Sequence, residues 1–99
     1  MSANVVEARF ETLIAQARRL RRKGELKKAT TALRQACLLD EERAPIWTLY
    51  AALLAGLGKR EEAGAAFRHA LWLRHRAGDV ARERSTANLA ASLGLACAA

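Results

Sequence analysis

Apolar residues recur at intervals of three or four through most of the chain, which is the spacing of one face of an α-helix. The first such stripe predicts a helix over residues 4–23. Its members are Val6, Phe10, Leu13, Ala17 and Leu20. Asn4 and Glu7 can form a capping box at the start of this helix. Gly24 supplies the left-handed turn that ends it.

The same signals predict four further helices. The second covers residues 25–39, the third runs from Pro45 to the closing segment 56–58, the fourth covers 59–76 and the fifth covers 79–97. Pro45 suits a first helical turn, where its missing N–H is not needed, and Asp79 is a good cap. The connections are short, so successive helices should run antiparallel. The sequence therefore predicts an all-α fold of about five helices.

Corresponding residues recur 34 positions apart. The matched pairs are Leu13 with Trp47, Ala17 with Ala51, Leu20 with Leu54, Gly24 with Gly58, Ala29 with Ala63, Leu33 with Phe67 and Ala36 with Ala70. The small residues allow two helices to cross closely, and the bulky ones fill the space on either side. This spacing predicts two copies of one helix hairpin, over residues 10–43 and 44–77.

This ordered set of residues resembles the tetratricopeptide repeat. The resemblance implies a short right-handed superhelix of stacked antiparallel hairpins, forming one domain over residues 1–99 with a capping helix at 79–97. Two features depart from the family pattern. The proline often found after the second helix is missing from both repeats, and Arg84 stands where a third repeat would place a bulky apolar residue.

Members of this family bind extended peptides or helices in a concave groove that is lined by the first helix of each repeat. The register of the resemblance assigns this role to Glu11, Ile14, Arg18, Arg21, Arg22, Thr48, Leu49, Ala52, Ala55, Gly56, Arg82, Thr86 and Leu89. Such a surface would have an apolar floor and an arginine wall, which suits an amphipathic or acidic segment. The plainer alternative is that the arginines only solvate a helix end. Some members clamp a terminal carboxylate with lysine and asparagine, and Ile14, Arg18 and Thr48 at those positions argue against such a clamp here.

Charge favours acidic partners. The chain has 99 residues, a length typical of one domain, and carries a formal net charge of +7. Eight cations gather around the first predicted turn, and we call them the basic cluster: Arg18, Arg19, Arg21, Arg22, Lys23, Lys27, Lys28 and Arg34. Nucleic acid is a rival partner for this cluster. Against it, no aromatic residues interleave with the cations and no nucleic-acid motif is present.

Two apolar features lie outside the expected groove. Trp72, on the fourth helix, either anchors a partner or covers the seam against the following helix. The segment 89–97 is apolar around much of its circumference. We expect Leu89, Leu93 and Leu95 either to close over the groove or to form a dimer seam, with Trp72, Leu93 and Leu95 as the oligomer contacts.

Catalytic, metal and cofactor sites are not expected. His69 and His75 lie six residues apart on one helix and therefore point in different directions. We interpret His69 as a solvated residue and His75 as a partner of the helix dipole. Cys37 and Cys97 have no spacing suited to a metal or disulfide framework and are expected to be reduced.

No apolar run approaches the roughly 20 residues of a membrane span, and the start of the chain does not resemble a signal peptide. We therefore expect a cytoplasmic protein without a membrane span. Its predicted function is that of an adaptor or small chaperone, which holds a peptide or helix of a partner protein in its groove. The alternatives are a self-associating assembly subunit and, less favoured, a basic nucleic-acid-binding helical protein.

Overall fold

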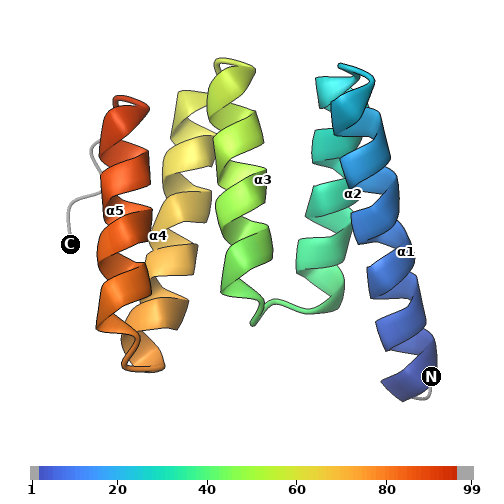
Figure 1. The fold of residues 1–99 in the computed structure, drawn as a ribbon, viewed down its shortest axis with the longest axis horizontal. Coiled ribbons are helices and arrows are strands. Elements are labelled where there is room, and N and C mark those ends of the chain that lie inside the picture. Colours follow the sequence, from blue (N-terminus) through green and yellow to red (C-terminus); the bar gives the residue numbers. More distant parts are fainter. Residues whose placement is uncertain (1–2, 96–99) are drawn as a thin grey trace. The chain divides into compact units, whose positions relative to one another are not determined.

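The computed structural model describes residues 3–95, and these residues form five α-helices and no strand (Figure 1). The helices are α1 (Ala3–Arg22), α2 (Leu26–Leu39), α3 (Ala44–Gly56), α4 (Arg60–Arg76) and α5 (Val80–Ser92). The prediction of an all-α fold is confirmed. The first four helices also agree with their predicted bounds to within one or two residues. Asn4 is already helical, so it is not the residue that caps α1.

Four of the helices end in the same glycine motif. At the end of α1, Gly24 has φ +80°, its N–H donates to the Arg21 carbonyl at 3.0 Å, and the Glu25 N–H donates to the Leu20 carbonyl at 3.0 Å. This bond pattern defines the Schellman motif, which satisfies the last carbonyls of a helix. It recurs at Gly58, Gly78 and Gly94. The helix α2 differs, because it ends at Asp40 in an extended conformation.

The last of these glycines corrects the predicted length of α5. The apolar pattern predicted a helix to residue 97, whereas α5 ends at Ser92. Gly94 has φ +76° and donates to the Ala91 carbonyl at 2.9 Å, so the chain turns away at this point. The remainder of the predicted helix, residues 96–99, lies outside the described residues. The other predicted boundary, the cap at Asp79, is confirmed by the Arg82 N–H, which donates to Asp79 Oδ1 at 3.1 Å.

The chain divides into two compact units, which we call unit 1 (Met1–Glu41) and unit 2 (Glu42–Ala99). In unit 1, α1 packs against α2 as an antiparallel hairpin (Figure 1). Its buried residues follow the predicted stripes of both helices. They are Phe10, Leu13, Ile14, Ala17, Ala29, Thr30, Ala32, Leu33, Ala36 and Cys37.

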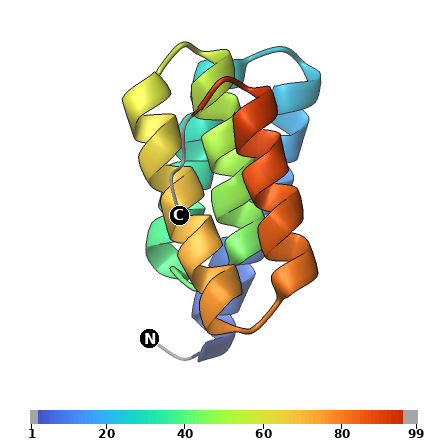
Figure 2. The same ribbon diagram turned by 90° about the vertical axis from the view of Figure 1, so that its left-hand side faces the viewer.

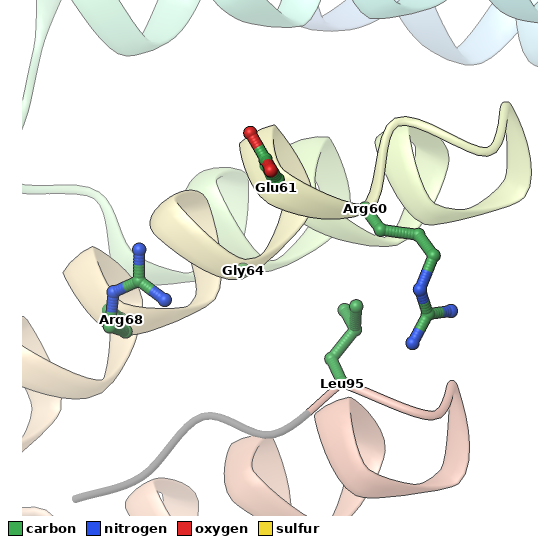
Figure 3. Close-up of a pocket in the computed structure, with 5 residues that line it drawn as sticks. All are labelled: Arg60, Glu61, Gly64, Arg68 and Leu95. Carbon is green, nitrogen blue, oxygen red and sulfur yellow. The ribbon is translucent and has the colours of Figure 1, made fainter.

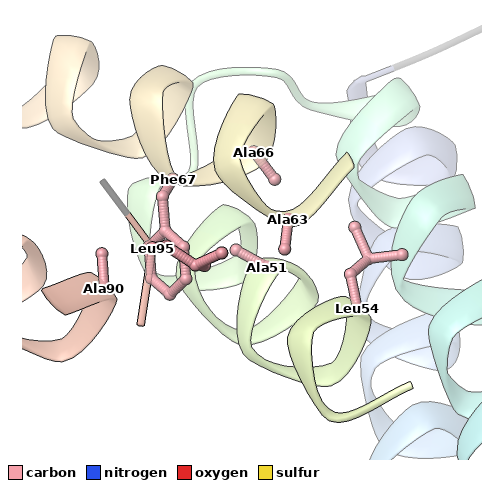
Figure 4. Close-up of a cluster of buried hydrophobic side chains, with 7 residues drawn as sticks. All are labelled: Ala51, Leu54, Ala63, Ala66, Phe67, Ala90 and Leu95. Carbon is pink, nitrogen blue, oxygen red and sulfur yellow. The ribbon is translucent and has the colours of Figure 1, made fainter. Parts of the chain in front are cut away.

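In unit 2, α4 packs against both α3 and α5 (Figure 2). One cluster of buried side chains joins the three helices (Figure 4), and its members are Ala51, Leu54, Ala63, Ala66, Phe67, Ala90 and Leu95. Phe67 is fully buried and is the largest residue in this cluster. Alanine dominates the packing in both units, since ten of the nineteen buried apolar residues in the described range are alanine. These small side chains allow the helices to approach closely.

The 34-residue step is visible in the helix boundaries. The helices α1 and α3 end 34 residues apart, at Arg22 and Gly56, and α2 and α4 begin 34 residues apart, at Leu26 and Arg60. The step then lengthens, because Gly94 follows Gly58 by 36 residues. With this shift, Thr86 rather than Arg84 takes the place that corresponds to Tyr50. Thr86 is buried and Arg84 is exposed, which accounts for the arginine that did not fit the repeat pattern.

Candidate partner-binding surfaces

The basic cluster lies on unit 1, over the last turns of α1, the connecting turn and α2. All eight of its side chains are exposed, because the apolar stripe of α1 takes the residues that face α2 and leaves the cations outside. Arg18, Arg21 and Arg22 are three or four residues apart and therefore share one face of α1. They are also placed where the negative end of the helix dipole favours cations.

No ion pair involves any of the eight cations within the described part of the chain. The only acidic residues of α1 and of the turn that follows it are Glu7, Glu11 and Glu25. Like charges held close together repel one another, and an opposite charge from outside relieves that repulsion. The cluster therefore presents positive charge that the chain itself does not neutralise.

A pocket of about 350 to 440 Å³ lies on each unit. The pocket of unit 1 opens between α1 and α2 and includes Lys28 of the basic cluster. Its lining consists of Gln16, Leu20, Lys28, Thr31, Ala32 and Gln35. Leu20 and Ala32 supply apolar surface, while the two glutamine amides and the lysine can bind polar groups. This pocket could therefore hold a small apolar side chain next to a carboxylate.

The residues assigned to a groove by resemblance are only partly accessible. On α1, Glu11 and the three arginines Arg18, Arg21 and Arg22 are exposed, whereas Ile14 is buried. On α3, Gly56 is exposed and four residues are half-buried: Thr48, Leu49, Ala52 and Ala55. Thr48, Ala52 and Ala55 share one face of that helix.

On α5, Arg82 and Leu89 are exposed, but Thr86 on the same stripe is buried. Its Oγ1 accepts a hydrogen bond of 3.2 Å from Arg74 Nε of α4. Thr86 therefore joins α5 to α4, a use that its position in the sequence does not reveal. Ile14 and Thr86 offer little surface to a partner.

The predicted oligomer contacts also separate into two kinds. Leu95 is buried in the core cluster of unit 2 and Leu93 packs against it, so both are used within the chain. Trp72 is 53% exposed. Its ring stacks on His69 of the same helix, with ring centres 5.7 Å apart, and the guanidinium of Arg76 lies 4.5 Å from its ring centre.

His69 is not solvated as predicted but half-buried between two tryptophans. Its ring centre lies 4.3 Å from that of Trp47 on α3 and 5.7 Å from that of Trp72. Trp47 in turn meets Tyr50 edge to face at 6.1 Å. Spacing along α4 could have suggested the contact between His69 and Trp72, which are three residues apart. The contact with Trp47 depends on how α3 and α4 pack.

His75, in the last turn of α4, has its Nδ1 3.2 Å from Glu83 Oε1. The same end of α4 carries Arg76, whose Nη2 lies 2.5 Å from Glu42 Oε1. Carboxylates from other parts of unit 2 thus already meet two of the cations around Trp72.

The pocket of unit 2 lies between α4 and the end of α5 (Figure 3). It is lined by Arg60, Glu61, Gly64, Arg68 and Leu95. Figure 3 shows Arg60 and Arg68 on either side of Gly64, with Leu95 directed toward α4. Arg60 donates through Nη2 to the Gly94 carbonyl. Arg68 has no ion pair or side-chain hydrogen bond within residues 3–95.

Other kinds of site find no support among the described residues. These contain no group of three or more His, Cys, Asp or Glu side chains that could hold a metal ion. No helix in the same range has the length and apolar character needed to cross a membrane. Burial raises the pKa of the Cys37 thiol to about 12, which makes it a poor nucleophile. Comparison of the chain with protein-family models, curated proteins and solved structures gives no significant match.

Proposed function

We propose that this chain is a tetratricopeptide-repeat module that binds an acidic segment of a partner protein. The observation that carries the proposal is the basic cluster of unit 1, whose eight cations are all exposed and make no ion pair within the described residues. The family assignment rests on the ordered small and bulky residues and on the 34-residue spacing of the helix boundaries.

The chemistry of the cluster fits carboxylates. Arginine offers a planar fork of donors that binds a carboxylate through two hydrogen bonds, and five of the eight cations are arginines. Arg18, Arg21 and Arg22 on one helix face can therefore meet carboxylates spaced along a peptide. The adjoining pocket, with Leu20 and Ala32, supplies a place for an apolar side chain of the same segment.

A protein partner fits unit 1 better than a single-stranded nucleic acid does. Base stacking requires exposed aromatic rings beside the cations. The only aromatic residue of unit 1 is Phe10, and it is buried. A duplex could still contact the cluster through phosphates alone, so it belongs in the test.

The proposal is tested by screening a random peptide library displayed on phage against the wild-type chain. We expect the enriched peptides to carry several Asp or Glu residues beside an apolar one, and their affinity to fall as salt rises. The variant Arg18→Glu/Arg22→Glu should lose these peptides. The matched variant Lys59→Glu/Arg84→Glu makes the same charge change at exposed residues of unit 2 and should retain them.

Two results would count against the proposal. One is the enrichment of peptides without acidic residues, or equal binding by the cluster variant and its control. The other is tighter binding of double-stranded DNA than of any selected peptide at about 0.15 M salt, since this would indicate a nucleic-acid function.

A further inference from the structure

We propose that unit 2 carries a second binding site, separate from the basic cluster, at which Trp72 anchors an apolar side chain that is flanked by carboxylates. The site, which we call the Trp72 surface, consists of Arg68, His69, Trp72, His75 and Arg76 on α4. Its partner is an acidic, amphipathic segment of another protein. The inference does not depend on the function proposed for unit 1.

Exposure is the first observation. Tryptophan has one of the largest apolar surfaces of any side chain, yet Trp72 leaves 53% of its surface in contact with solvent. Such residues commonly become hot spots when a partner removes that surface from water.

Order is the second observation. Trp72 stacks on His69, which itself packs against Trp47, while Arg76 lies over the Trp72 ring. These contacts hold the indole in place before any partner arrives. A partner would therefore lose little free energy in immobilising the ring, which favours binding.

Charge is the third observation, and it identifies the occupant. The residues three and four positions away from Trp72 are Arg68, His69, His75 and Arg76, so every neighbour on its helix face is an arginine or a histidine. Two of them already bind carboxylates of this chain, Glu83 at His75 and Glu42 at Arg76. The surface thus accepts acidic groups in the structure itself.

Arg68 provides the place for a carboxylate from the partner. It is exposed, and it forms no ion pair within residues 3–95. Gly64 leaves room for its guanidinium along the helix, because a Cβ at that position would come within 3.3 Å of Arg68 Nη1 (Figure 3). Since four residues rise about 6 Å along a helix, the partner should place a carboxylate roughly 6 Å from its apolar anchor.

A second copy of this chain fits the Trp72 surface less well. Two-fold pairing of this surface with itself would bring Arg68, His75 and Arg76 close to the same residues of the other copy. Each chain also carries a net charge of +7, which adds to the repulsion. A peptide of opposite charge avoids both costs.

The test uses the full chain and two synthetic peptides, in which leucine is flanked by glutamate at helical spacing in one and at extended spacing in the other. The indole N–H signals of Trp47 and Trp72 are followed by NMR and assigned with Trp72→Phe. We expect one of the peptides to shift the Trp72 signal. Trp72→Ala and Arg68→Glu should each weaken its binding about tenfold or more, as expected when an anchor is lost.

Two controls separate this site from others. Leu38→Ala removes a large apolar side chain that is 63% exposed at the position 34 residues earlier, where the surrounding helix face has mixed charge, and it should leave binding unchanged. Arg18→Glu/Arg22→Glu should also leave the Trp72 shift unchanged, even if it abolishes binding to unit 1. Because Arg68 is exposed, Arg68→Glu tests the site without disturbing the core.

Several outcomes would overturn the proposal. The first is that neither peptide shifts the Trp72 signal at millimolar concentration. Another is that only the cluster variant weakens binding, which would assign the peptide to unit 1. Self-association that is removed by Trp72→Ala in sedimentation would identify a second copy as the occupant. A larger Trp72 shift with single-stranded DNA than with either peptide would identify nucleic acid.

Discussion

Burial determines the chemistry of Cys37. Its side chain is 1% exposed, and desolvation raises its pKa from 9.0 to about 12. In a Cys97→Ser background we expect the folded chain to react very slowly with Ellman's reagent at pH 8, and the denatured chain to react at once. The raised pKa also implies that the neutral thiol's contribution to stability is complete below pH 9.0 and declines as pH rises toward 12. Rapid modification of the folded chain would contradict the burial of Cys37.

Phe67 is the residue on which the core of unit 2 depends most. It is fully buried and is surrounded mainly by alanines, which cannot fill the space that a smaller residue would leave. We expect Phe67→Ala to cost about 3–5 kcal/mol of unfolding free energy, measured by urea denaturation. This is a large share of the stability of a small domain. The exposed change Gln35→Ala should have little effect, and an equal loss in both variants would refute the assignment of Phe67 to the core.

The identity of single buried residues could be predicted from the sequence, but their contacts could not. Periodicity placed Phe67, Leu33 and Leu54 on buried stripes because burial follows the turn of a helix. It placed His69 in solvent because it could not show that Trp47, on another helix, lies 4.3 Å away. Contacts between helices depend on crossing geometry, which one sequence does not contain.

The end of α3 contains two glycines with opposite requirements. Gly58 has φ +78°, whereas Gly56 is helical, and no atom lies within 4 Å of a Cβ built at either one. Gly58→Ala should therefore lose about 1–2 kcal/mol through backbone strain alone. Gly56→Ala should gain about 0.4–1 kcal/mol, because alanine reduces the conformational entropy of the unfolded chain. Thermal melting of the two variants measures the difference, and similar shifts in both would disprove the glycine motif.

Asp79 holds the start of α5 through its bond with the Arg82 N–H. Mainly because of that bond, the pKa of Asp79 lies below its ordinary value. Its charged form therefore stabilises the fold above the ordinary pKa, and this contribution is lost as pH falls through the lowered value. Asp79→Ala should lower the melting temperature by a few degrees, whereas Asp79→Asn should keep the cap and remove only this acid dependence. Equal melting of the Ala variant and the wild type would show that the cap is not needed.

Helix ends could be predicted wherever a glycine or a cap marks them, because those residues act through local geometry. The end of α5 was placed too late because the apolar residues around Gly94 looked like the continuation of a helix. The change from a 34-residue to a 36-residue step was missed for a related reason. It arises from a longer α4, and the repeat pattern alone does not show where that helix ends.

For the molecule as a whole, the net charge of +7 acts on folding as well as on binding. Cations concentrated in the basic cluster repel one another in the folded state. We expect the melting temperature of the free chain to rise when salt increases from about 0.02 to 0.2 M, because salt screens this repulsion. Arg18→Glu/Arg22→Glu should reduce the rise more than Lys59→Glu/Arg84→Glu does. A melting temperature that is independent of salt would show that the cluster carries no repulsion to be relieved.

Charge and candidate sites could be predicted from the sequence in unequal measure. The basic cluster was identified by counting, since exposed cations on a helix are apparent from its wheel. The Trp72 surface required the structure, because it depends on His69 being held by Trp47 and on Glu42 and Glu83 reaching α4 from other elements.

The abundance of alanine among the buried residues has a consequence for the energetics of unfolding. An alanine side chain removes far less hydrocarbon from water than leucine or phenylalanine does, so the denatured chain gains comparatively little hydrated apolar area. The heat-capacity increment measured by calorimetry should therefore be small for 99 residues. A chain with this property keeps a nearly constant margin of stability over a wide span of temperature, and it melts gradually rather than abruptly.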